Sequence, residues 1–166
     1  MISGETAIGA HPVETVYPMS RIAETVERDP TWQEQLRHES PEAPVSRDAV
    51  AAAQAATKLA ENIGACAIAV LTNTGLTARR VSQARPGIPV IAITEHEHIA
   101  RQLALWHGIV PVIDPLHDTI EGLLRRVEHH ARKLGIAGSG QSLVIVGAVP
   151  RTESNPSVFL EISHLQ

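Results

Sequence analysis

Residues 67–79 read AIAVLTNTGLTAR, and this stretch decides the fold class of the chain. It opens with five apolar residues, a run that is too short for a helix and that follows Gly64. A continuous apolar run of this length is typical of a strand that is buried on both faces. Asn73 and Gly75 are turn residues, and a helix is expected after them. The stretch therefore predicts a strand–turn–helix unit of a parallel α/β domain.

The same alternation of strand and helix continues along the chain. Three further apolar runs are predicted to be buried strands: residues 90–94, 110–113 and 142–147. Apolar periodicity and end signals predict the helices: residues 46–63, 77–84, 97–107 and 118–134. Pro111 weakens the third strand, because proline has no N–H for the ladder. Residues 157–163 alternate apolar with polar positions after a connection too short for a helical crossover. The prediction is an α/β three-layer sandwich with a mostly parallel sheet of about five strands, the last one antiparallel.

The first part of the chain has a different character. Residues 1–29 contain one helical pattern, which Pro18 is expected to kink, and too little apolar surface to fold alone. Prolines interleaved with charged residues mark residues 30–46 as a linker. The predicted organisation is therefore residues 1–29, a linker at 30–46 and an α/β domain over residues 47–166.

Composition narrows the class of protein. The chain has 166 residues, 43% of them hydrophobic, and a formal net charge of -4. That balance disfavours a nucleic-acid partner, which would require a basic excess on some face. No apolar run reaches the roughly 18 residues of a membrane helix, so no membrane partner is expected and the predicted compartment is cytoplasmic. A lone Cys66 and the scattered histidines, His96 and His98 among them, predict no metal site.

The loop at residues 72–77 is the candidate functional site. It leaves the carboxyl end of a predicted parallel strand, where ligands bind in such sheets, and it leads into a helix N-terminus with free N–H groups. Thr72, Asn73, Thr74, Gly75 and Thr77 supply hydrogen-bond donors and a tight turn without adding charge. These residues suit the binding of a phosphate or carboxylate. An ordinary strand-to-helix turn, with threonines capping the helix, explains the same pattern.

Three separated motifs carry a resemblance to a known family. Residues 71–86 read LTNTGLTARRVSQARP, residues 93–112 read ITEHEHIARQLALWHGIVPV, and residues 1–14 read MISGETAIGAHPVE. Taken in chain order, they resemble signatures of the pyruvate kinase family in the family's own order. The first two are similar to its C-terminal regulatory domain. The third is similar to the segment that closes its catalytic (β/α)8 barrel, so the resemblance implies that residues 1–29 are a remnant of the end of that barrel.

The resemblance implies both a role and its limits. Full-length members transfer a phosphoryl group from phosphoenolpyruvate to ADP in glycolysis, with magnesium and potassium as expected cofactors. Their catalytic residues lie in segments without a counterpart here, so no catalytic residue is predicted and the chain alone is expected to be inactive. Carried over residue by residue, the loop that binds an effector's phosphate gives Thr72, Asn73, Thr74, Gly75 and Thr77. In family members that respond to a bisphosphate, a Trp and an Arg further along the chain grip the second phosphate, and a Gly-rich loop follows the fourth strand. The corresponding residues 115–124 offer neither Trp nor Arg, and residues 150–156 lack Gly. A bisphosphate effector is therefore not expected.

Alternatives remain open at this point. The expected role is an allosteric and oligomerisation domain, with a phosphorylated small-molecule effector and a homo-oligomer or a separate barrel chain as partners. A stand-alone module for small phosphates or for protein interaction is a second hypothesis. The C-terminal half of a split pyruvate kinase is a third.

Overall fold

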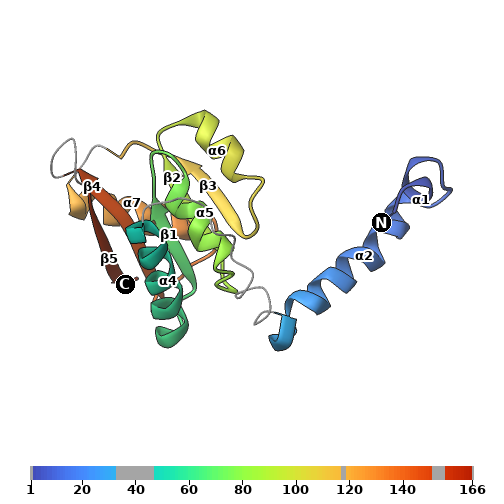
Figure 1. Cartoon of the computed structure of the whole chain (residues 1–166), viewed down its shortest axis with the longest axis horizontal. Coiled ribbons are helices and arrows are strands. Elements are labelled where there is room, and N and C mark those ends of the chain that lie inside the picture. The colour runs from blue at the N-terminus through green and yellow to red at the C-terminus, as the bar shows by residue number, and fades with distance from the viewer. Residues whose placement is uncertain (1, 33–46, 117–118, 151–155, 166) are drawn as a thin grey trace. The chain divides into compact units, whose positions relative to one another are not determined.

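The computed structural model describes residues 2–32, 47–116, 119–150 and 156–165. The chain divides into two compact units, Met1–Ser40 and Pro41–Gln166, and each is described here by itself (Figure 1).

The second unit is built on one five-stranded sheet with the strand order β3-β2-β1-β4-β5. Its strands are β1 (Ala67–Leu71), β2 (Val90–Thr94), β3 (Ile109–Ile113), β4 (Ser142–Pro150) and β5 (Pro156–His164). The pairs β1–β2, β2–β3 and β1–β4 are parallel, and β4–β5 is antiparallel. The predicted α/β class, with a mostly parallel sheet and an antiparallel last strand, is confirmed.

Helices form a layer on each face of this sheet (Figure 1). One face is covered by α4 (Arg47–Ile63), α5 (Leu76–Gln83) and α6 (Glu97–Leu103), whose apolar side chains share one core cluster. The other face is covered by α7 (Ile120–Lys133). Parallel crossovers are right-handed, so a chain that moves outward from β1 to β3 and then returns to β4 must place the return helix on the opposite face.

The core is made of small and branched aliphatic residues. All five residues of β1 are buried, as its unbroken apolar run predicts. Helix α4 approaches the sheet closely because its buried apolar positions are alanines, namely Ala52, Ala53, Ala56 and Ala60; Thr57 is buried as well. Aromatic residues make up only 2% of the chain, so close approach of backbones replaces bulky side chains as the means of filling the interior.

The end of α6 differs from the sequence prediction, and the position of β3 in the sheet explains why it can contain a proline. The predicted helix at 97–107 is too long: α6 ends at Leu103, and separate turns bring the chain to Gly108, which has a φ of 70° and leads into β3. Pro111 is tolerated because β3 is an edge strand of the sheet, where one side of the backbone needs no ladder partner.

The first unit contains α1 (Gly4–Ala7) and α2 (Pro12–Glu27), with Pro18 inside α2. No residue of either helix is buried, and several large apolar side chains are exposed, Val13 at 78% and Tyr17 at 65% among them. An open groove of about 520 Å³ between the helices is lined by Thr6, Pro12, Val13, Val16, Tyr17 and Ser20. The predicted linker at residues 30–46 lies mostly outside the described residues, so the three-part organisation stays a prediction.

Candidate functional site

The loop after β1 lies where the connections of the sheet change direction. From β1 the chain moves outward through β2 to β3, and it then returns to form β4 on the other side of β1. The carboxyl ends of β1 and β4 therefore flank a topological switch point, which is the usual ligand position in open parallel sheets. Residues 72–75 leave β1 at this point and lead directly into α5.

Thr72 anchors the start of the loop. Its side chain is buried, with 6% exposed, and its Oγ1 accepts a hydrogen bond of 2.9 Å from the N–H of Gly75. The backbone N–H of Thr72 donates to the carbonyl oxygen of Ile93 on β2 at 3.0 Å. Thr72 thus serves as a structural acceptor within the loop, and its hydroxyl is already engaged.

Gly75 is required by both conformation and space. It caps α5 with a φ of 76°, in the left-handed region that side chains disfavour. A Cβ atom built on Gly75 would lie 3.2 Å from Ile99 Cγ2 and 3.2 Å from Leu103 Cδ2. The turn therefore packs closely against α6, and this packing fixes the position of the α5 N-terminus relative to α6.

The hydrogen-bond donors of the loop face outward from this anchor. Asn73 and Thr74 are exposed, and Thr77 is half-buried. The N–H groups of Thr77 and Ala78 have no hydrogen-bond partner among the described residues. No acidic residue lies in the first turn of α5. Free N–H groups at a helix start, neighbouring hydroxyls and the absence of a carboxylate are the chemistry of an anion site.

The five predicted site residues therefore share one turn but differ in role. Thr72 and Gly75 shape the turn, while Asn73, Thr74 and Thr77 line its open side. Residues 117–118 and 151–155 lie outside the described residues. The prediction that a second phosphate contact is missing there consequently remains untested.

Arg79 follows the loop on α5. Its guanidinium carbon lies 5.9 Å from the centre of the Trp106 ring, within the range of a cation–π contact. Trp106 is partly buried and packs against the core cluster beneath α4, α5 and α6. The arginine nearest the loop is therefore held against the aromatic ring by its position on the helix.

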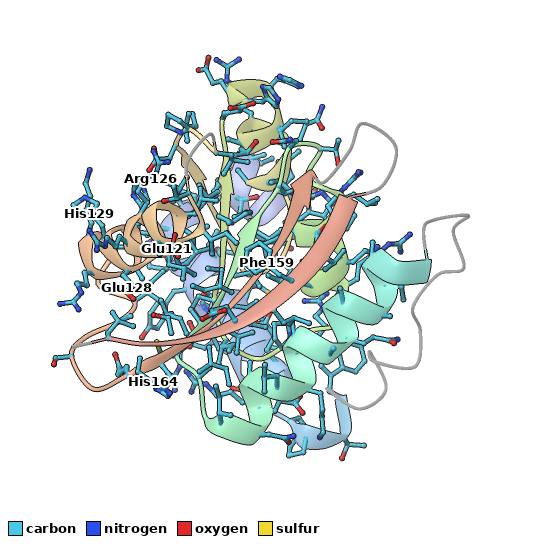
Figure 2. The ribbon with its side chains drawn as sticks, turned by 90° about the vertical axis from the view of Figure 1, so that its left-hand side faces the viewer. Glu121, Arg126, Glu128, His129, Phe159 and His164 are labelled. Carbon is cyan, nitrogen blue, oxygen red and sulfur yellow. The ribbon has the colours of Figure 1, made fainter. Side chains whose placement is uncertain are left out.

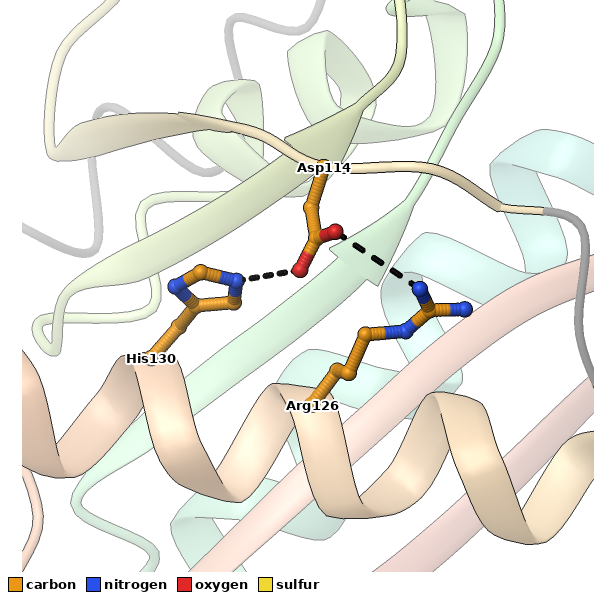
Figure 3. A network of polar contacts seen from close by, with 3 residues as sticks. All are labelled: Asp114, Arg126 and His130. Atoms are coloured by element: carbon orange, nitrogen blue, oxygen red, sulfur yellow. Dashed lines mark hydrogen bonds and ion pairs between the residues drawn. The ribbon is translucent and has the colours of Figure 1, made fainter.

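A polar network that the sequence does not reveal lies at the carboxyl end of β3 (Figure 3). Asp114 Oδ2 and His130 Nε2 are 2.5 Å apart, and Asp114 Oδ1 is 3.7 Å from a terminal guanidinium nitrogen of Arg126. All three side chains are at least two-thirds buried, with 17%, 16% and 29% exposed. Arg126 and His130 are four residues apart on α7, so one carboxylate fastens two turns of that helix to the sheet.

The described residues give little support for other chemistry. They contain no group of three or more His, Cys, Asp and Glu side chains arranged to hold a metal ion. Burial raises the pKa of the Cys66 thiol, whose Sγ lies 3.3 Å from the carbonyl oxygen of Ser142. Within the described ranges, no helix combines the length and hydropathy needed to cross a membrane.

Comparison with known proteins connects this fold to one family. Residues 50–162 match the family model described as "Pyruvate kinase, alpha/beta domain". A pyruvate kinase from Agrobacterium vitis is 40% identical over 151 residues, covering 90% of this chain and 31% of that protein. One from Clostridium acetobutylicum is 32% identical over 98% of this chain and 34% of its own length. The chain thus spans about a third of the length of the curated relatives it matches.

A solved structure agrees with the sequence comparisons. The structure titled "Cryptosporidium parvum pyruvate kinase in complex with ADP" superimposes with a TM-score of 0.77 and 29% sequence identity. The match covers 100% of this chain and 33% of that one. This chain therefore belongs to the pyruvate kinase family, and residues 50–162 are its C-terminal α/β domain.

Proposed function

We propose that this chain is the effector-binding and subunit-assembly part of a pyruvate kinase and does not transfer phosphoryl groups on its own. The observation that carries the proposal is the loop of residues 72–77, placed at the switch point of a domain that belongs to this family. The whole enzyme transfers a phosphoryl group from phosphoenolpyruvate to ADP in glycolysis, a role that goes with a cytoplasmic location. In this proposal residues 1–29 are the end of the catalytic barrel and residues 30–46 are the linker.

The effector that fits this loop best is a small molecule with one phosphate group. The N–H groups of Thr77 and Ala78 have no hydrogen-bond partner among the described residues, Thr77 being half-buried and Ala78 buried, and Thr74 and Thr77 add hydroxyls to the same turn. Thr72, Asn73 and Gly75 complete the predicted set. Each neutral hydrogen bond contributes about 0.5–1.5 kcal/mol, and one to a charged oxygen contributes somewhat more, so a few of them total about 4–5.5 kcal/mol, which corresponds to a dissociation constant of about 0.1–1 mM.

Catalysis by this chain alone is not supported by its side chains. Phosphoryl transfer requires metal ions and positioned cations around the transferred group. Magnesium and potassium are expected for the full-length enzyme, but the described residues bring together no ligand set for a metal ion. In this proposal the rest of the enzyme supplies the sites for those ions, and the described part of this chain contributes anion binding.

Assembly into a homo-oligomer is supported by the outer strand of the sheet. Strand β5 is an edge strand, and Val158, Leu160 and Ile162 are 42%, 38% and 38% exposed on the face that α4 covers. An edge strand with an apolar face is a ready partner for another strand. In antiparallel self-pairing centred on Leu160, Val158 of one copy lies opposite Ile162 of the other, so apolar side chains meet across the axis.

The oligomer can be tested by charge substitution on this strand. Leu160→Lys should shift the sedimentation of the chain toward the monomer, because a charge would be buried between the strands. Leu134→Lys is the matched control, since Leu134 has a similar exposure of 42% but follows α7. Equal sedimentation of Leu160→Lys and the unaltered chain would exclude β5 as the contact.

The exposed face of α2 supports a second partner, a separate barrel chain. Val13, Tyr17 and Ile22 are all more than half exposed, an unusual number for one helix of a folded protein. A split pyruvate kinase would cover this face with the rest of the barrel. A stand-alone phosphate-binding or interaction module would leave it for a different partner. Co-expression with a pyruvate kinase barrel and recovery of activity would select the split enzyme.

The effector proposal is tested by equilibrium binding of sugar monophosphates, AMP and inorganic phosphate. Thr77→Val should weaken binding by about tenfold, since a hydrogen bond to a charged oxygen is lost. Thr25→Val, an exposed helical position in α2, should bind like the unaltered chain. Absence of binding at millimolar concentration, or an equal effect of both substitutions, would reject the loop as an effector site.

A further inference from the structure

Phe159 on β5 is the chain's one phenylalanine, and its position connects the outer strand to the candidate loop. Figure 2 shows it on the sheet, with α7 to its left. Its side chain is half-buried and joins the core cluster beneath α7, whereas Val158 and Leu160 face the other way. Across the ladder Phe159 is paired with Gly147 of β4. The next strand inward is β1, which ends at Leu71.

The missing side chain of Gly147 lets the phenyl ring reach across β4. A Cβ atom on Gly147 would lie 2.7 Å from Phe159 Cε1 and 2.9 Å from Phe159 Cζ. The same point is 3.3 Å from Leu71 Cβ. The ring therefore fills the space above Gly147, and its Cε1 and Cζ atoms and Leu71 Cβ lie within 3.3 Å of the same point. Phe159 packs against the core cluster to which Leu71 belongs.

This packing occurs where the pairing of β1 with β4 ends, while its pairing with β2 continues. The register between β1 and β2 extends to the pair Leu71–Ile93, but the register between β1 and β4 ends at Val70–Val146. Past this last pair with β4, the backbone bond of the loop start runs to β2, from the Thr72 N–H to the Ile93 carbonyl oxygen, and Leu71 adds side-chain packing on the β4 side. Thr72, whose hydroxyl accepts the Gly75 N–H, is the next residue along the chain.

We propose that Phe159 is a positioning residue for the loop of residues 72–75. Its ring holds Leu71 in place from the β4 side, and thereby keeps Thr72 and the start of α5 in the geometry that presents the free N–H groups. The inference rests on the proposed effector function for its biological meaning. The positioning itself is a property of the ligand-free chain, and it can be measured without any ligand.

The experiment compares Phe159→Ala with two matched variants. Phe159→Leu keeps an apolar side chain near Leu71 and should behave like the unaltered chain. Ile136→Ala removes a partly buried side chain from the same core cluster, but Ile136 lies between α7 and β4, at the amino end of the parallel strands. It therefore controls for a general loss of packing.

The first readout is hydrogen exchange of the Gly75 amide without ligand. Phe159→Ala should accelerate this exchange at least about tenfold relative to Ile136→Ala, after both are normalised to the exchange of buried β4 amides. Gly147→Ala, whose Cβ would displace the ring, should have the same effect with Phe159 still present. Equal exchange of the Gly75 amide in Phe159→Ala and Ile136→Ala would overturn the proposal.

The second readout is phosphate binding, and it separates the two proposals. If the unaltered chain binds a sugar monophosphate, Phe159→Ala should raise the dissociation constant about tenfold and Phe159→Leu should restore it. If the unaltered chain binds no phosphate, the effector function fails, while the exchange comparison still decides whether Phe159 positions the loop. If the Phe159→Ala chain is too unstable to study, the exchange of the Gly75 amide in Gly147→Ala decides whether Phe159 positions the loop.

Discussion

Replacing Gly75 by alanine tests the geometry of the loop in the most direct way. Gly75 has a φ of 76°, and a Cβ there would lie 3.2 Å from side-chain atoms of Ile99 and Leu103. Gly87 offers a matched control, because its φ is 71° and a Cβ there would have no atom within 4 Å. The two substitutions share the penalty of the left-handed conformation, about 1–2 kcal/mol. The contact that the new methyl group makes with α6 is present only at Gly75.

The expected difference follows from that contact. Inserting a methyl group into a packed site costs about 1–3 kcal/mol, so Gly75→Ala should destabilise the domain by that much more than Gly87→Ala. At about 4 °C per kcal/mol for a domain of this size, the melting temperatures should differ by about 4–12 °C. Thermal unfolding followed by circular dichroism measures this. Phosphate affinity should fall in Gly75→Ala and stay unchanged in Gly87→Ala. Equal melting temperatures of the two variants would refute the reasoning.

Four further outcomes are expected. Thr72→Val leaves the buried N–H of Gly75 without its acceptor, so it should lower the unfolding free energy by about 1–3 kcal/mol, while Thr74→Val, at an exposed position, should change it little. The purified chain should show no magnesium-dependent conversion of phosphoenolpyruvate and ADP in a coupled assay; turnover above a mock preparation would contradict this. Amides of α2 should exchange far faster than those of β1 and β4, because no residue of α2 is buried. Since burial raises the pKa of Cys66, less thiolate is present at pH 8, and iodoacetamide should alkylate it more slowly than free cysteine.

Strands in this chain are predictable because a doubly covered parallel strand has an unbroken apolar run. The run at 67–71 gives the bounds of β1 without error, and that at 90–94 gives those of β2. Helix ends are less predictable, because apolar periodicity continues past the last hydrogen-bonded turn. The side chains of residues 104–107 suit a helix, but the chain must turn at Gly108 to enter β3, and α6 stops at Leu103.

The candidate loop is visible in the sequence because it is local. Thr72, Gly75 and Thr77 lie within six positions, so a strand–turn–helix pattern is sufficient to bring them together. The contacts of Phe159 and Asp114 could not be predicted in this way. The first depends on the register of β4 against β5, and the second on where α7 crosses the sheet. Both contacts depend on tertiary packing, which cannot be predicted from a local sequence pattern.

Amide chemical shifts report whether the loop after β1 binds a phosphate group. Sugar monophosphates, AMP and inorganic phosphate are titrated to millimolar concentration into the isotope-labelled chain. A phosphate-binding loop should give saturable shifts of the amides of residues 74–78, largest at Thr77 and Ala78, whose N–H groups have no partner among the described residues. If no amide of residues 72–78 moves with any of these compounds, the loop is a structural turn and binds no phosphate.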